Sequence, residues 1–381
     1  MLQRLLRFEP HDEPAQKLAK LVNGLEQYGL PLTDYVPLIA PLLTLPVPET
    51  YPRLTLTLEA QKEKTYLAVQ SWLLTIAERA GLALVFEDLH WADPSTLALL
   101  GHLIDQVATA LLLLVLTCRP EFSPPWSTRS HFASITLNRL PRSHTEEVVQ
   151  NVTGGKPLPG QVLEQIIAKT DGVPLFIEEL TRTMLESDLL SERDGHYDLS
   201  GPLPPLAIPS TLQDSLTARL DRLGDAREVA QLAATIGRDF SYELLRSIAS
   251  KDEVRLRKAL GMLVEAEVLY RRGVMPQAQF LFKHALIRDA AYESLLKSKR
   301  QQVHSRIARA LNEEFANLAE TQPELVAHHY TEAGLPEAAV HYWQKAGELA
   351  LERYAFHESI NQFTRALSLL RSVLWRTCCH L

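Results

Sequence analysis

Residues 82–100 read LALVFEDLHWADPSTLALL, and this stretch decides the fold. Its apolar run Leu82–Phe86 has the length and composition of a buried strand, and the carboxylates Glu87 and Asp88 follow at once. A helix is expected to begin at Asp93-Pro94, as N-cap and first helical residue. The pattern by itself fits either a charged functional site held by a rigid strand or a buried strand that ends in a solvated acidic turn.

The bulk composition is that of a soluble globular protein of two or three domains. The 381 residues are 46% hydrophobic, and 39 basic against 46 acidic residues give a net charge of −7. This balance argues against nucleic acid as a partner. The three cysteines form neither a disulfide framework nor a metal motif, which indicates the cytoplasm. No apolar run approaches the roughly 18 residues of a membrane helix, so no membrane association is expected.

Strands alternate with helices around the opening stretch. A second apolar strand is predicted at Leu111–Thr117 and a shorter third one at Ser134–Leu137. An amphipathic helix over Gln61–Ala80 precedes the first strand, whereas the proline-rich residues 31–52 predict only short segments and turns. Strands that alternate with helices of this length predict an α/β domain with a parallel sheet.

The pattern becomes mostly helical from Pro141 onward. Residues 187–209 are polar and then proline-rich, which is typical of a linker. Further along, Val268–Arg271 and Gln279–Phe282 can pair as a hairpin around Gly273. Three helices with a small hairpin are the outline of a winged-helix domain.

Two helices near the end of the chain carry the same pattern of residues. A small residue, an aromatic residue and an alanine recur at one spacing, in Ala339, Trp343 and Ala346 and again in Ser359, Phe363 and Ala366. Tetratricopeptide helices interlock in this way, and a stable array needs about three repeats. We therefore expect an incomplete array, with residues 372–381 breaking the helical pattern.

Seven blocks occur in an order that resembles one family. They are LVFEDLHWADPSTLALL (84–100), TCRPEF (117–122), TDGVPLFIEELTRTMLES (170–187), PLPPLAIPSTLQDSLTARLDRL (202–223), IGRDFSYELL (236–245), FKHALIRDAAYESLLKSKRQQVHSRIA (282–308) and ELVAHHYTEAG (324–334). Together they resemble the AAA-related signal-transduction ATPases with numerous domains (STAND). They are most similar to the ATPase and tetratricopeptide region of bacterial class III adenylate cyclases.

The resemblance implies a fold that is mostly helical overall. Residues 1–140 would form a partial α/β P-loop NTPase core with a parallel sheet and a Walker B motif, and 141–205 an all-α lid and linker. Residues 206–297 would form a winged-helix-like domain, and 298–381 incomplete tetratricopeptide-like repeats. The implied function is a nucleotide-dependent signalling ATPase module that regulates an attached output domain, an adenylate cyclase. The helical repeats would bind a protein partner or that output domain.

The resemblance also implies a site for ATP and Mg²⁺. Glu87 and Asp88 match the Walker B acids, which hold Mg²⁺, and Asp88 would be the catalytic residue that orients the attacking water. Arg119 resembles a sensor of the γ-phosphate. Gly172 and Pro174 match the Gly-x-Pro element that packs near the adenine.

Each of these assignments has a plainer alternative. Arg119 can pair with Glu121, and Gly172 with Pro174 can simply end one helix and begin the next. At the level of function, the chain can belong to an ATPase-type transcriptional activator whose DNA-binding domain lies elsewhere. It can also be a non-catalytic protein-interaction scaffold.

The phosphate-binding loop G-x-x-x-x-G-K-[ST] does not occur in residues 1–381. The nearest string, Gly154-Gly155-Lys156-Pro157, has proline where Ser or Thr is required and reads as a surface turn. We therefore expect the chain to start inside the ATPase domain, after its phosphate-binding loop. Because that loop makes most β- and γ-phosphate contacts, we expect weak nucleotide binding and negligible ATP hydrolysis.

Overall fold

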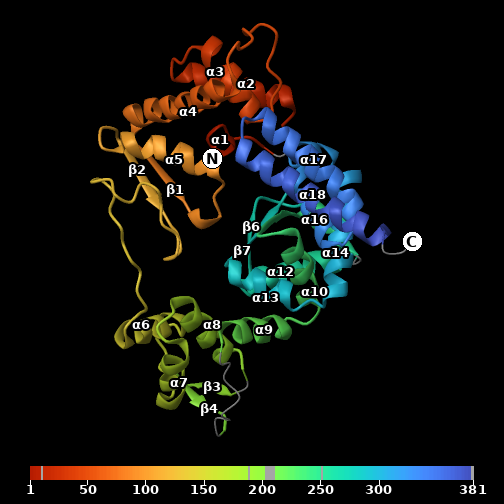
Figure 1. Cartoon of the computed structure of the whole chain (residues 1–381). Coiled ribbons are helices and arrows are strands. Elements are labelled where there is room, and N and C mark those ends of the chain that lie inside the picture. The colour runs from red at the N-terminus through yellow and green to blue at the C-terminus, as the bar shows by residue number, and fades with distance from the viewer. Residues whose placement is uncertain (10–11, 188, 202–210, 250–251, 379–381) are drawn as a thin grey trace. The chain divides into compact units, whose positions relative to one another are not determined.

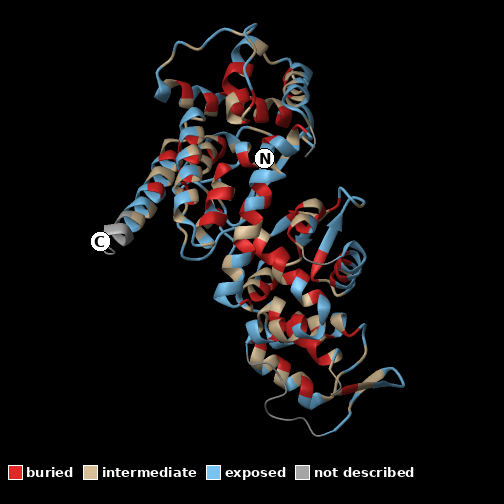
Figure 2. Ribbon diagram, turned by 90° about the vertical axis from the view of Figure 1, so that its right-hand side faces the viewer, coloured by how far each residue is buried: buried red, intermediate tan, exposed pale blue. Residues whose placement is uncertain are grey.

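A computed structural model describes residues 1–9, 12–187, 189–201, 211–249 and 252–378, and the chain divides into two compact units (Figure 1). The first unit comprises Met1–Ser134, Asn317–His328 and Pro336–Leu381, and the second comprises Ile135–Ala316 and His329–Leu335. Most helices have buried residues along one side and exposed residues along the other (Figure 2). None of the helices in these residues combines the length and the apolar composition that a membrane crossing needs.

The first unit contains a two-stranded parallel sheet and its covering helices. Its elements are α1 (Leu2–Leu5), α2 (Pro14–Gln27), α3 (Leu32–Leu42), α4 (Leu58–Ala80), β1 (Leu82–Phe86), the 3-10 turn η1 (Leu89–Trp91), α5 (Pro94–Val107), β2 (Leu112–Leu116), α17 (Pro336–Glu352) and α18 (Phe356–Cys378). Strands β1 and β2 pair in parallel, with Leu82 opposite Leu112 and Phe86 opposite Leu116. Helices α15 (Ala316–Thr321) and α16 (Pro323–Glu332) have residues in both units.

The sequence predicts the elements around β1 well. Asp93 is the N-cap of α5, where its carboxylate accepts the Thr96 backbone N–H at 2.7 Å, and Pro94 is the first helical residue. The expectation of only short segments and turns over residues 31–52 is wrong in part, because α3 is a helix of 11 residues that contains Pro37 and Pro41. Residues 36–40 of this helix are buried, so their packing compensates for the hydrogen bonds that the prolines cannot donate.

The sheet is packed on one face only. Leu100, Leu103 and Leu112 belong to a large core that extends to α2, α3 and α4. On the other face of the sheet, apolar side chains remain exposed, Val85 to 62%, Leu113 to 61% and Val115 to 42%. The third strand expected at residues 134–137 is wrong: this stretch is irregular, and Ile135 and Leu137 are 83% and 91% exposed.

Helices α17 and α18 pack closely through the residues of the recurring pattern. Ala339, Trp343 and Ala346 are buried on α17 and Ser359 on α18. The Ser359 hydroxyl donates to the Gly347 carbonyl at 2.8 Å. The expected break after residue 372 is wrong, since α18 runs to Cys378; residues 379–381 lie outside the described part of the chain.

The second unit contains two antiparallel sheets among short helices. Its elements are α6 (Arg142–Val152), α7 (Gly160–Thr170), α8 (Pro174–Leu185), β3 (Leu190–Arg193), β4 (His196–Leu199), α9 (Leu212–Arg222), α10 (Asp225–Ile236), β5 (Asp239–Ser241), α11 (Tyr242–Ile248), α12 (Glu253–Glu265), β6 (Leu269–Arg272), β7 (Gln279–Phe282), α13 (Ala285–Glu293) and α14 (Lys297–Glu313). The three-stranded sheet has the order β5-β7-β6.

One expectation for this unit is confirmed and another is wrong. The hairpin around Gly273 is present, with Leu269 opposite Phe282. The expected linker 187–209 is wrong in part, because β3 and β4 form a hairpin within it. Hydrogen bonds from Ser200 N–H to the Leu189 carbonyl and from Tyr197 N–H to Pro157 fasten this hairpin. Residues 202–210 of the expected linker lie outside the described residues.

We predict opposite effects of alanine at two helical glycines. A Cβ at Gly347 of α17 would lie 2.7 Å from the Phe363 ring of α18, whereas a Cβ at Gly261 of α12 would meet nothing within 4 Å. Gly347→Ala should therefore destabilise the protein by about 1–3 kcal/mol through overpacking. Gly261→Ala should stabilise it by about 0.5–1 kcal/mol, because alanine loses less backbone entropy in a helix. Urea unfolding of both variants measures the difference, and a Gly347→Ala variant that is not destabilised would contradict the close α17–α18 packing.

Candidate functional site

The turn after β1 is bonded to the end of β2. Thr117 N–H donates to the Phe86 carbonyl at 2.9 Å, and the Thr117 carbonyl accepts Leu89 N–H at 2.8 Å. The Thr117 hydroxyl accepts Asp88 N–H at 2.9 Å. Asp88 has φ 58° and ψ 46°, a left-handed conformation that costs a non-glycine residue free energy. Thr117 therefore supports a tight, strained turn that carries the two acids.

Both carboxylates of this turn are accessible. Glu87 and Asp88 are exposed, and in the described residues neither is in an ion pair. No group of three or more His, Cys, Asp or Glu in those residues could hold a metal ion. Mg²⁺ commonly uses one or two protein carboxylates, with water and substrate phosphate as the remaining ligands. The two acids therefore fit Mg²⁺ that is bound together with a nucleotide, and do not form a complete protein site.

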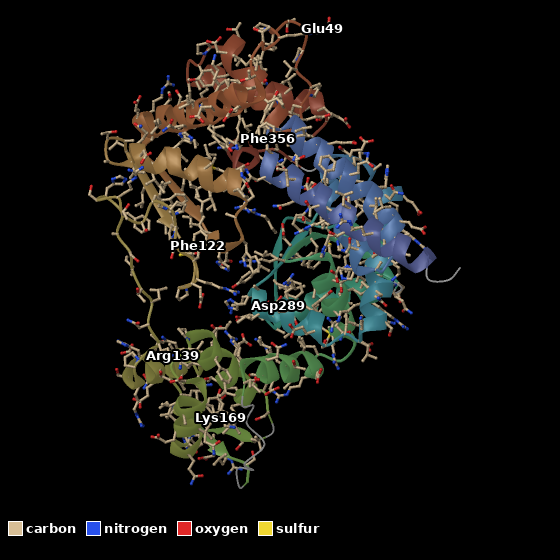
Figure 3. The ribbon with its side chains drawn as sticks, in the orientation of Figure 1. Glu49, Phe122, Arg139, Lys169, Asp289 and Phe356 are labelled. Atoms are coloured by element: carbon tan, nitrogen blue, oxygen red, sulfur yellow. The ribbon has the colours of Figure 1, made fainter. Side chains whose placement is uncertain are left out.

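Arg119 lies at the same edge of the sheet, three residues after β2. Its carbonyl accepts Phe122 N–H at 3.0 Å, which closes a turn (Figure 3 labels Phe122). The guanidinium lies over the Trp91 ring, 5.8 Å from its centroid, and Trp91 is 75% exposed. The alternative pairing with Glu121 is not present in the described structure. Stacking on an indole keeps the charge of Arg119 available to an anion.

Gly172 is required by a close backbone contact. Its φ is 68°, and its carbonyl accepts Leu140 N–H at 2.7 Å. A Cβ at this position would lie 2.2 Å from the Leu140 carbonyl oxygen. Asp171, also left-handed, forms an ion pair with Arg139 (labelled in Figure 3). The packing of the segment before α6 against this turn is thus a sufficient reason for glycine.

Pro174 begins helix α8, with Val173 as the N-cap. Proline is favoured there because its missing N–H would have no partner in the helix. The structure therefore supports the plainer role of this Gly-x-Pro string as a helix stop and start, and it leaves the adenine contact as a prediction. Gly172 and Pro174 belong to the second unit, whereas Glu87, Asp88 and Arg119 belong to the first.

The Gly154-Gly155-Lys156 string is a surface turn, as expected. Gly154 and Gly155 are exposed with positive φ, and the Lys156 ammonium pairs with Glu192 at 2.6 Å. Thr117 and Trp91 were not among the expected site residues. The aligned ends of two parallel strands are a signal that could have identified Thr117.

No family model matches the chain. An uncharacterized protein of Rhizobium meliloti (strain 1021) is 30% identical over 319 residues, which are 82% of this chain and 30% of that protein. The chain thus spans about a third of the length of this curated relative.

One solved structure is similar to this chain over most of its length. It is a Signal Transduction ATPase with Numerous Domains (STAND) protein with a tetratricopeptide repeat sensor, from Pyrococcus horikoshii. The identity is 12%, the TM-score is 0.48, and the match covers 93% of this chain and 51% of that one. A TM-score of this size does not establish a common fold.

We predict that alanine destabilises the protein more at one of two glycines, although both have a left-handed backbone. Gly172→Ala should destabilise the protein by about 2–4 kcal/mol, since it adds a clash with Leu140 to the conformational strain. Gly155→Ala, where φ is 82° and a Cβ meets nothing within 4 Å, should cost only about 1–2 kcal/mol. Urea or thermal unfolding compares the two, and equal losses would show that the Leu140 contact is unimportant.

Proposed function

We propose that the chain is part of a nucleotide-dependent signalling ATPase module of the STAND kind, which regulates an attached output domain. The observation that carries the proposal is the edge of the parallel sheet. There Glu87 and Asp88 follow β1, Arg119 follows β2, and Thr117 bonds the two ends together. We further propose an adenylate cyclase as the output domain, from the resemblance of residues 202–308 to the regions that follow such domains.

The residues of this edge have complementary tasks in the proposed mechanism. Mg²⁺, when bound, would neutralise charge that develops on the phosphates. Glu87 and Asp88 would hold the ion, and the Asp88 carboxylate would also accept a hydrogen bond from the attacking water and orient it. The Arg119 guanidinium, stacked on Trp91, would pair with the terminal phosphate. The left-handed backbone at Asp88 keeps its carboxylate near the end of β1.

The phosphate-holding half of the site is proposed to come from a segment outside residues 1–381. Val85, Leu113 and Val115 leave one face of the sheet exposed, and exposed apolar sheet surface is costly in water. We propose that a further segment covers this face and carries the phosphate-binding loop. The greater length of the Rhizobium meliloti relative supports such a segment.

The helical end of the chain is proposed to bind a protein partner or the output domain. Ile360, Leu367 and Leu370 of α18 are 63%, 56% and 41% exposed and recur at helical spacing. An apolar stripe of this kind is typical of a helix that packs against another helix. A partner helix would complete the interlocking pattern that Trp343 and Ser359 begin between α17 and α18.

We predict weak, Mg²⁺-dependent binding of a fluorescent ATP analogue to purified 1–381, with negligible ATP hydrolysis. Asp88→Asn and Glu87→Gln should each weaken binding roughly tenfold, because each removes one charge-assisted contact with the ion. Glu121→Gln is the matched control: Glu121 is an exposed acid at the same edge of the sheet and should leave affinity unchanged.

Two outcomes would contradict the proposal. Binding that does not depend on Mg²⁺ or on either acid would identify the motif as a solvated turn and favour a non-catalytic scaffold. Robust ATP turnover by 1–381 that is lost in Asp88→Asn would show that no external phosphate-binding segment is needed.

A further inference from the structure

Helix α8 of the second unit presents two kinds of side chain to its neighbours. Phe176, Ile177 and Leu180 are buried in a core with Val149 of α6 and Ile166 of α7. This contact is apolar and joins α6, α7 and α8 into one layer, which we call the helical layer. Parting it would expose hydrocarbon to water, at a cost of roughly 25 cal/mol for each Å² of apolar surface.

The contacts of α8 with α9 are partly neutral, since the Thr183 and Ser215 hydroxyls lie 3.0 Å apart and Leu212 packs on the apolar core, and partly charged. The Glu179 side chain is fully buried, and the Arg219 side chain of α9 is 4% exposed. Arg219 Nη1 donates to Glu179 Oε2 at 2.5 Å, and Arg219 Nη2 donates to the Ala266 carbonyl. Ala266 caps the end of α12 shortly before β6. Arg219 therefore connects the helical layer with the segment that leads from α12 into β6.

A second charged group surrounds this pair. Lys283, which follows β7, donates from its ammonium to Glu178 Oε1 at 2.9 Å and to Glu267 Oε2 at 2.7 Å. Arg182 of α8 completes the group, 3.0 Å from Glu267 and 3.3 Å from Glu178. Burial alone would raise the pKa of Glu178, but Lys283 and Arg182 together outweigh this effect and hold that pKa below its ordinary value. The connection between the layer and the sheet thus includes a network of ions.

The network is incompletely satisfied. Glu179 Oε1 and His284 Nε2 are buried and make no hydrogen bond within the described residues, and Arg219 Nε has no hydrogen bond there but lies 3.8 Å from Glu186 Oε1. A buried ion pair repays its desolvation only when its remaining polar atoms are bonded, so this pair contributes little stability. Separating α8 from the three-stranded sheet would let water solvate all these groups. The charged contact is therefore easier to open than the apolar one.

We propose that the charged face of α8 is a latch that fastens the helical layer to the three-stranded sheet and can open while the layer stays folded. The closed form has the Glu179–Arg219–Ala266 connection. The open form hydrates Glu179 and Arg219 and leaves the core around Ile177 intact. This device does not depend on nucleotide binding, so it can be tested whether or not the proposed function holds.

Hydrogen exchange of the full chain tests the latch. In Arg219→Met, Glu179 is left buried without its partner, so the latch should open. Amides of residues 266–272 should exchange roughly tenfold faster or more, whereas those of α6 and α7 should stay within about twofold of the parent protein. Glu179→Met/Arg219→Met should restore protection at residues 266–272, because neither charge remains buried.

Controls separate the latch from a general loss of stability. Arg142→Met removes an exposed pair with Glu164 between α6 and α7 and should leave residues 266–272 unchanged. If Arg219→Met does not fold, Arg219→Lys keeps the charge and should give a smaller increase at the same amides. Equal acceleration throughout residues 142–295, unchanged exchange at 266–272, or no recovery in the double variant would each overturn the proposal.

Acid pH should also loosen the latch, through His284. Burial, then the neighbouring Lys283, lowers the pKa of this imidazole, while Glu178 and Glu179 of α8 oppose the effect and Arg238 adds to it. An opened His284 would have the ordinary pKa of about 6.5, so the open form binds protons more readily. The stability of the closed latch is therefore present above about pH 6.5 and lost as pH falls below it.

This pH dependence is measured at the same amides, after correction for intrinsic exchange rates. Protection of residues 266–272 should fall severalfold from about pH 7.5 to about pH 5.5. His284→Gln should remove most of this loss, because glutamine does not titrate. An identical loss in the variant and the parent protein would exclude His284 as the titrating group.

Discussion

The candidate site depends above all on the parallel pairing of β1 and β2. Because parallel strands end at the same edge of a sheet, the pairing of Phe86 with Leu116 brings residues 87–88 beside residues 117–119. Thr117 reinforces this edge, since its N–H, carbonyl and hydroxyl all bond to the β1 end and its turn. A shift of one residue in this register would move Thr117 away from Asp88 and reverse the faces of one strand relative to the other.

Two kinds of contact hold the parts of the second unit together. Apolar packing makes α6, α7 and α8 one layer, while charged groups connect α8 with the sheet β5-β7-β6. Apolar surface is costly to expose, but charges regain hydration when they separate, so the two contacts differ in how readily they open. Helix α8 takes part in both, and it begins at the Gly172 turn that packs on Leu140.

Much of the local structure could be predicted from the sequence. The first two apolar strands, the N-cap at Asp93 and the hairpin around Gly273 depend on neighbouring residues, and all of these are present. The errors occur where distant contacts outweigh local preference. Helix α3 forms despite Pro37 because its residues 36–40 are buried. Residues 134–137 have a strand composition but no neighbouring strand, and β3 with β4 is fastened by Pro157, which is remote in sequence.

The sequence by itself determined the carboxylate pair after the first strand, the turn glycines and the absence of a phosphate-binding loop from residues 1–381. These are properties of residue type and spacing, so no fold is needed to recognise them. Only the tertiary structure decided that Thr117 supports Asp88, that Arg119 stacks on Trp91 and that Arg219 is buried against Glu179. Such contacts join residues far apart in the chain. They follow from the register of strands and the packing of helices, which local sequence patterns do not encode.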